Sequence, residues 1–139
     1  MVGAASQESE SRSAHRNPRA GQIKFVLAGL VVMGVLVQAA LAGRHIAEDA
    51  SISLHGTLGS IVFALQVALV AVAMAQRATR SALVIAVLLL GLLVGQLGLG
   101  YAGRDATGAV AWHVLNGVAL FGLASVQLAR SWPRTGDPR

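Results

Sequence analysis

The stretch SALVIAVLLLGLLVGQLGLGYAG, residues 81–103, contains no Asp, Glu, Lys or Arg. An apolar helix needs about 20 residues to cross a bilayer, and this stretch is long enough. Three further charge-free runs occupy residues 25–43, 50–76 and 106–129. Of the 139 residues, 55% are hydrophobic and only 12% are charged, which is about half the charge of an average soluble domain. The sequence therefore predicts an all-α integral membrane protein and excludes a soluble globular enzyme.

The four apolar runs predict four transmembrane helices joined by short connections. We place the spans at residues 22–42, 54–76, 81–102 and 109–130, between a disordered tail of residues 1–21 and a second tail of residues 131–139. Because the connections are short, consecutive spans should be antiparallel neighbours in an up-down-up-down four-helix bundle. Gly91, Gly95 and Gly98 share one face of the third span, which lets another helix or a flat ligand approach closely, and we favour helix packing.

The basic residues are distributed unevenly between the two sides of the predicted membrane. Nine Lys and Arg residues lie on the side of both termini, whereas only Arg44 and Arg104 lie in the two loops of the other side. Cytoplasmic segments of membrane proteins carry such an excess of basic residues. We therefore expect a multi-pass protein of the plasma membrane with both termini in the cytoplasm. The positive charge then indicates topology and not a nucleic-acid partner.

The chain contains an internal repeat of one helical hairpin. In each half, a Gln near the end of the odd-numbered span is followed by Gly-Arg and then by a His-x-x-x-Gly motif that opens the next span. The repeated residues are Gln38, Gly43-Arg44, His55 and Gly59 in the first half and Gln96, Gly103-Arg104, His113 and Gly117 in the second. The repeat places these polar residues at one level of one leaflet, where ionisable side chains usually have a function.

Two histidines that face each other across a helical bundle are suited to axial ligation of haem iron. His55 and His113 open the second and fourth spans, which are diagonal in an up-down bundle. Neutral imidazole nitrogen is a good ligand for iron. Gly59 and Gly117 lie one turn after each histidine on the same face, so they leave room for the flat macrocycle. A carbonyl or a Gln side chain can accept the hydrogen bond of the second ring nitrogen.

Further polar residues surround this predicted haem site. Gln38 and Gln96 are candidates for interhelical hydrogen bonds or for contacts with the cofactor. Asn116 shares a helix face with His113, so both a packing role and a site role are open to it. Arg44 and Arg104 lie at the mouth of the site, where a guanidinium can pair with a haem propionate.

The string LVGQLGLG at residues 93–100, followed by a short loop and His113, resembles the haem A synthase family. The resemblance covers the four spans and implies that His55 and His113 match the haem-ligand pair of one four-helix half of that family. Where the family has a glutamate three residues before a ligand histidine, this chain has Ile52 and Val110, and it contains no Cys at all. The resemblance therefore supports haem binding rather than haem oxidation.

These observations favour a b-type cytochrome-like membrane protein rather than a stand-alone enzyme. It would hold one bis-histidine haem b for electron transfer or haem handling. Its expected partners are the lipid bilayer, a quinone or a redox protein, and either a second copy or a larger membrane complex. Two alternatives stay open. One is a non-catalytic accessory subunit of a larger complex, in which the glycines and polar residues serve packing alone. The other is a metal site, for example for copper, at His45, His55 and His113.

Overall fold

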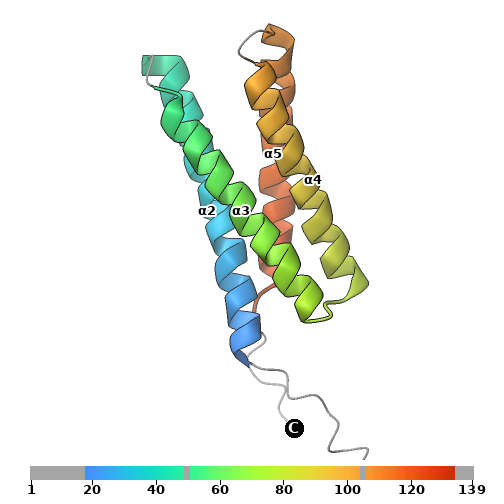
Figure 1. Ribbon diagram of the computed structural model, residues 1–139. Coiled ribbons are helices and arrows are strands. Elements are labelled where there is room, and N and C mark those ends of the chain that lie inside the picture. The colour runs from blue at the N-terminus through green and yellow to red at the C-terminus, as the bar shows by residue number, and fades with distance from the viewer. Residues whose placement is uncertain (1–17, 49–50, 104–105, 134–139) are drawn as a thin grey trace, which may run out of the picture.

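Four α-helices make up the bundle seen in the computed structural model, which describes residues 18–48, 51–103 and 106–133 (Figure 1). The helices are α2 (Pro18–Glu48), α3 (Ser53–Ala75), α4 (Arg80–Ala102) and α5 (Thr107–Arg130). Each of them is long and apolar enough to cross a membrane. The predicted fold class is confirmed: the protein is a multi-pass, four-helix membrane bundle.

Each helix packs against two neighbours in a closed ring. Helix α2 lies against α3, α3 against α4, α4 against α5, and α5 against α2. This order makes α3 and α5 a diagonal pair, as expected for an up-down-up-down bundle. We call the end with His55 and His113 the histidine end and the opposite end, with Arg77, Arg80 and Arg130, the arginine end. The first helix begins and the last helix ends at the arginine end (Figure 1).

The first helix is longer at both ends than the sequence indicates. It begins at Pro18, so residues 18–21, which we assigned to the tail, form its first turn. A proline is tolerated there because the first N–H groups of a helix have no partner within it. The helix also continues past Gly43-Arg44 to Glu48, so Arg44 and His45 lie on a helix and not in a loop. The rest of the predicted tails, residues 1–17 and 134–139, lies outside the described residues.

A tight connection at the arginine end joins α3 to α4. Arg77 has a φ of 48°, in the left-handed region that usually follows the last turn of a helix. Thr79 then caps α4, because its side-chain oxygen accepts a hydrogen bond from the Ala82 N–H at 3.4 Å. These two residues reverse the chain within a few positions, which keeps α3 and α4 antiparallel.

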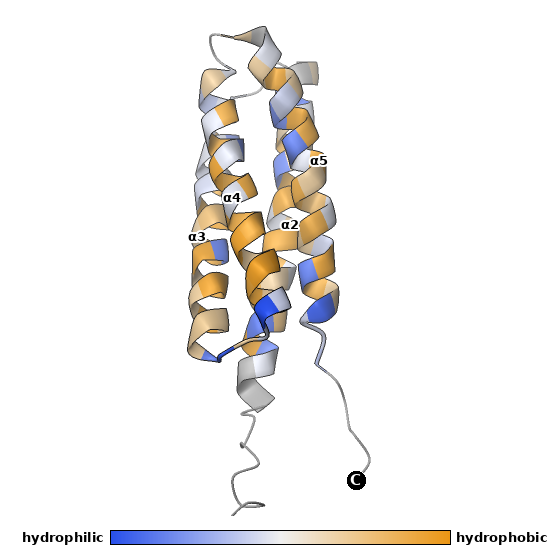
Figure 2. Cartoon of the chain, turned by 90° about the vertical axis from the view of Figure 1, so that its right-hand side faces the viewer, coloured by the Kyte–Doolittle hydropathy of each residue, from blue (hydrophilic) through white to orange (hydrophobic). Residues whose placement is uncertain are grey.

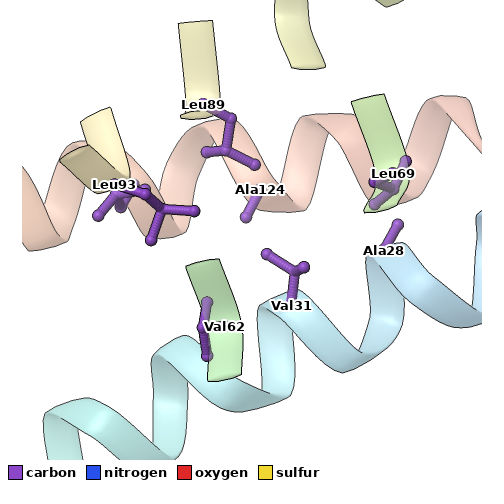
Figure 3. Close-up of a cluster of buried hydrophobic side chains, with 8 residues drawn as sticks. Ala28, Val31, Val62, Leu69, Leu89, Leu93 and Ala124 are labelled. Carbon is purple, nitrogen blue, oxygen red and sulfur yellow. The ribbon is translucent and has the colours of Figure 1, made fainter. Parts of the chain in front are cut away.

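The apolar core occupies the middle of the bundle and extends toward the arginine end. Figure 3 shows its side chains pointing toward one another. All four helices contribute to it, through Ala28, Val31, Val62, Leu69, Leu89, Leu93, Leu120 and Ala124. The histidine end is packed differently. Among its described residues Gly59 is buried, whereas the side chains around it are half-buried or exposed. The end that carries the histidines therefore has no comparable apolar core.

Many large apolar side chains lie on the outside of the bundle. Examples are Ile61, Leu88 and Val118, which are between 51% and 67% exposed. Figure 2 shows apolar residues along the length of all four helices, as a surface in contact with lipid requires. Gly91, Gly95 and Gly98 also face outward, because a Cβ built at any of them meets no atom within 4 Å. The prediction of close helix packing at these glycines is wrong within this chain.

Candidate functional site

The two histidines of the repeat meet across the bundle diagonal. His55 lies in the first turn of α3, and His113 lies early in α5. Their ring centroids are 5.9 Å apart, and the ring planes are inclined by 53°. The structure thus brings together two residues from opposite halves of the chain at one depth, as the repeat predicts.

Each histidine makes the same hydrogen bond to the other helix of its own hairpin. His55 Nδ1 lies 3.1 Å from the carbonyl oxygen of Gln38, and His113 Nδ1 lies 3.1 Å from that of Gln96. In both cases the carbonyl belongs to the residue 17 positions earlier. Because a carbonyl oxygen only accepts, Nδ1 carries the proton in each ring. A neutral ring in this tautomer has its lone pair on Nε2, the arrangement typical of metal-ligating histidines.

The side chain of Gln96 extends the hydrogen-bond chain in the second half. Its Nε2 lies 3.0 Å from His113 Nε2, and its Oε1 accepts a 2.7 Å hydrogen bond from Asn116 Nδ2. Asn116 also donates to the Leu92 carbonyl at 2.9 Å. Since His113 Nε2 has no proton, the Gln96 amide is the donor to it. The Gln96 side chain thus makes interhelical hydrogen bonds to two residues of α5.

The side chain of Gln38 behaves differently in the first half. Its Oε1 is buried and has no hydrogen-bond partner among the described residues. Such an atom is costly, because a buried acceptor loses its water without a replacement. The residue of α3 at the same repeat spacing as Asn116 is Leu58, which has no donor to offer. We call His55, His113, Gln38, Gln96 and Asn116 together the histidine site.

The two repeat glycines make room for the two glutamine side chains. A Cβ built on Gly59 would lie 2.7 Å from Gln38 Nε2, and one built on Gly117 would lie 3.3 Å from Gln96 Nε2. The space predicted for a macrocycle is thus occupied by amide groups at the ends of flexible side chains. Gly100 is a further close neighbour that sequence reasoning missed. A Cβ there would lie 3.3 Å from His113 Cε1, and its one-turn spacing from Gln96 is the signal that marks it.

The remaining candidates lie away from this cluster or outside the described residues. Arg44 is exposed on α2, and Arg104 lies outside the described ranges. His45 does not join His55 and His113, because the described part of the chain contains no group of three or more His, Cys, Asp or Glu residues placed to hold a metal ion. A three-histidine copper site therefore finds no support in the arrangement of these residues.

A second polar layer lies deeper in the bundle, and the sequence analysis did not identify it. Gln66 on α3 and Gln127 on α5 donate to each other's Oε1 atoms at 3.2 and 3.0 Å. Gln66 Nε2 also donates to the Ala86 carbonyl on α4 at 2.9 Å. We call these two residues the glutamine pair. Both are buried, and the pair is visible in the sequence only as two amides within apolar runs.

No protein-family model matches this chain, and no curated protein and no solved structure matches it either. The resemblance to the haem A synthase family therefore stays a prediction.

Proposed function

We propose that this protein is a b-type cytochrome-like membrane protein that holds one haem b between His55 and His113. The observation that carries the proposal is the pair of facing rings, 5.9 Å apart between centroids, each with Nδ1 bonded to a backbone carbonyl. That hydrogen bond orients the ring and leaves Nε2 as the donor atom. His55 and His113, two neutral imidazoles on diagonal helices, would hold the haem iron.

The donor set and the spacing of the histidine site fit a haem iron. Metal–imidazole bonds are about 2 Å long, so two histidines that hold one iron have to lie close together. The rings of His55 and His113 are that close, with 5.9 Å between their centroids. A second observation favours a ligand at this end of the bundle. The buried Oε1 of Gln38 is a hydrogen-bond acceptor without a partner among the described residues.

The packing at the histidine end also favours a cofactor. The five side chains of the histidine site are half-buried, and the described apolar core does not extend to them. The two hairpins, α2–α3 and α4–α5, diverge toward this end (Figure 1). A macrocycle inserted between them has to displace the glutamine amides that lie beside Gly59 and Gly117. These amides are at the ends of flexible side chains and are not part of the backbone.

When bound, the haem would supply one-electron transfer between its ferric and ferrous states. The residues of the chain have three tasks. His55 and His113 ligate, the carbonyls of Gln38 and Gln96 hold the two rings in orientation, and the apolar outer faces of the helices keep the site within lipid. Two histidine ligands leave no open coordination position, which suits electron transfer or haem handling better than oxygen chemistry.

The purified protein provides the test of this function. We expect apoprotein in detergent to bind ferric haem at one equivalent per chain and to show sharp low-spin absorption bands after reduction. The His45→Ala variant should behave like the wild type, because His45 belongs to no ligand group in the described chain. A protein that takes up no haem saturably would contradict the proposal and favour the accessory-subunit alternative.

We also propose that the histidine end faces the outside of the plasma membrane. The proposal is supported by the excess of Lys and Arg in the segments at the other end. The chain has no native cysteine, so any thiol labelling comes from the single cysteine that is introduced. Ser51→Cys in intact cells should react with an impermeant thiol reagent, whereas Thr79→Cys should not. The reverse labelling pattern would place the histidine end in the cytoplasm.

A further inference from the structure

The two halves of the histidine site differ at one repeat-related position. Asn116 donates from Nδ2 to Gln96 Oε1 at 2.7 Å and to the Leu92 carbonyl at 2.9 Å. Its counterpart on α3 is Leu58, a partly buried side chain that packs against the core. Leu58 cannot donate a hydrogen bond, and Gln38 Oε1 accordingly has no partner among the described residues. The difference between Asn116 and Leu58 thus explains why Gln96 Oε1 has a hydrogen-bond donor and Gln38 Oε1 has none among the described residues.

Asn116 decides which way the Gln96 amide points. Its Nδ2 can only donate, so the atom of Gln96 next to it has to be the carbonyl oxygen. The amide nitrogen of Gln96 then faces His113 and donates to Nε2 at 3.0 Å. This Nε2 is the nitrogen that a metal ion would need. A single chain of donors and acceptors therefore runs from Asn116 through Gln96 and ends on the ligand atom of His113.

In the part of the chain that the structure describes, the Nε2 atom of His55 does not accept a comparable hydrogen bond from a glutamine amide. His55 Nδ1 donates to the Gln38 carbonyl at 3.1 Å, so Nε2 of this ring also bears a lone pair. Within the described residues no hydrogen bond to that nitrogen is recorded, and the Gln38 amide is not held by a neighbour as the Gln96 amide is. The Nε2 atom of His113 thus accepts a hydrogen bond, whereas that of His55 accepts none from the described residues. Both rings are nevertheless oriented by the same contact between Nδ1 and a backbone carbonyl.

We infer that Asn116 is a positioning residue that holds Gln96 over His113 Nε2, so that His55 is the first ligand to engage and His113 the second. The ligation order rests on the proposed haem function, whereas the hydrogen-bond chain is a property of the polypeptide. Before His113 can ligate, Gln96 has to give up its hydrogen bond to Nε2 and turn aside. The Asn116–Gln96 contact opposes that rotation and thereby weakens the hold of His113 on a metal.

The size of the effect follows from population arithmetic. When the competent state of a site is only partly populated, the apparent affinity falls by that fraction. The net worth of one interhelical hydrogen bond corresponds to about a two- to tenfold change in an equilibrium constant. We therefore expect Asn116→Leu to bind ferric haem about two- to tenfold more tightly than the wild type, because the freed Gln96 can leave His113 Nε2.

The reverse exchange at the other half gives a second variant. In Leu58→Asn the new amide can donate to the unpartnered Gln38 Oε1 and turn the Gln38 amide nitrogen toward His55 Nε2. This variant should bind ferric haem more weakly by a similar factor. Leu58→Asn adds a hydrogen-bond donor, whereas Asn116→Leu removes one. The result for Leu58→Asn therefore does not depend on whether Asn116→Leu folds. Ser125→Leu is the matched control on α5, because the Ser125 hydroxyl donates only within its own helix, to the Phe121 carbonyl.

A measurement without haem tests the hydrogen-bond chain by itself. In apoprotein labelled with ¹⁵N-histidine, the unprotonated Nε2 of His113 should resonate apart from that of His55, because only His113 Nε2 accepts a hydrogen bond. In Asn116→Leu we expect the two Nε2 signals to converge, and in Ser125→Leu we expect them to stay apart. Unchanged signals in Asn116→Leu would overturn the role given to Asn116.

The haem titrations separate failure of this inference from failure of the proposed function. If the wild type binds no haem, both the proposed function and the proposed ligation order are contradicted. A wild type that binds haem through both histidines, with Asn116→Leu and Leu58→Asn unchanged in affinity, overturns the positioning role alone. Opposite shifts in the two variants, with Ser125→Leu like the wild type, support the inference.

Discussion

Side chains of α3 and α5 meet in both polar layers of the bundle, but the hydrogen bonds of the two layers differ. In the glutamine pair, Gln66 and Gln127 donate to each other, and both are buried, at 0% and 5% exposure. In the histidine site, Gln38 Oε1 has no partner among the described residues, and the side chains are only half-buried. In the glutamine pair the amide groups satisfy one another's hydrogen bonds. The histidine site keeps an unsatisfied acceptor, which a ligand can use.

The largest effect should come from filling the space beside the repeat glycines. In Gly59→Leu and Gly117→Leu the new side chain competes with the Gln38 or Gln96 amide and with any macrocycle that replaces it. Overpacking of this kind costs about 1–3 kcal/mol, and a rigid ring cannot move aside. We expect both variants to insert and stay helical but to lose most of their haem.

The haem-to-protein ratio, measured together with elution volume in detergent, checks this prediction. The matched control is Gly91→Leu, since a Cβ at Gly91 meets no atom within 4 Å. Full haem occupancy in both Gly59→Leu and Gly117→Leu would mean that these glycines do not border the cofactor. The histidine site would then resemble the glutamine pair in being a packing element.

The second largest effect should fall on the glutamine pair. Gln127→Leu leaves both polar atoms of the buried Gln66 amide without their Gln127 partner, and an unsatisfied buried group costs about 1–3 kcal/mol. The double variant Gln66→Leu/Gln127→Leu removes both amides and should cost much less than the single one. The free energy of unfolding in mixed micelles, determined for both variants, measures the coupling between them.

An additive result for these two glutamines would contradict the interpretation that they satisfy one another's hydrogen bonds. Neither variant should alter haem affinity by more than about twofold, because the glutamine pair makes no hydrogen bond to the histidine site. A large loss of haem in Gln127→Leu would show instead that the two layers are coupled.

The smallest effect should come from a glycine that serves neither layer. Gly91→Ala adds a methyl group in open space on the outside of α4, where alanine favours the helix by up to about 1 kcal/mol over glycine. We expect a slight gain in thermal stability and no change in haem uptake. Destabilisation, or a change in oligomeric state, would show that this face is covered in the membrane.

Residue spacing in the sequence is sufficient to predict the fold class and most of the histidine site. Four charge-free runs indicate four spans, and identical spacings of Gln, His and Gly in the two halves bring His55 and His113 to one level. The backbone acceptors at Gln38 and Gln96 follow from the same repeat. The glutamine pair does not follow, because Gln66 and Gln127 occupy unrelated positions in the repeat, although their side chains meet in the fold.

Two other features could not be predicted for physical reasons. The direction of the Gly91 face is hidden because a lipid-exposed helix is apolar all round and lacks the polar stripe that orients a soluble helix. The difference between Gln38 and Gln96 depends on Leu58 and Asn116, whose contacts are set by side-chain rotamers. The end of α2 was misplaced because Gly43 can be accommodated within a helix, at a modest cost.

The claim that both histidines ligate one haem is tested most directly by chemical rescue of a missing ligand. We would record the reduced-minus-oxidised absorption spectrum of His55→Gly and His113→Gly, each loaded with haem, before and after addition of imidazole. Each variant should lack the low-spin spectrum of the wild type, and imidazole should restore it. Retention of the wild-type spectrum by either variant in the absence of imidazole would contradict the account.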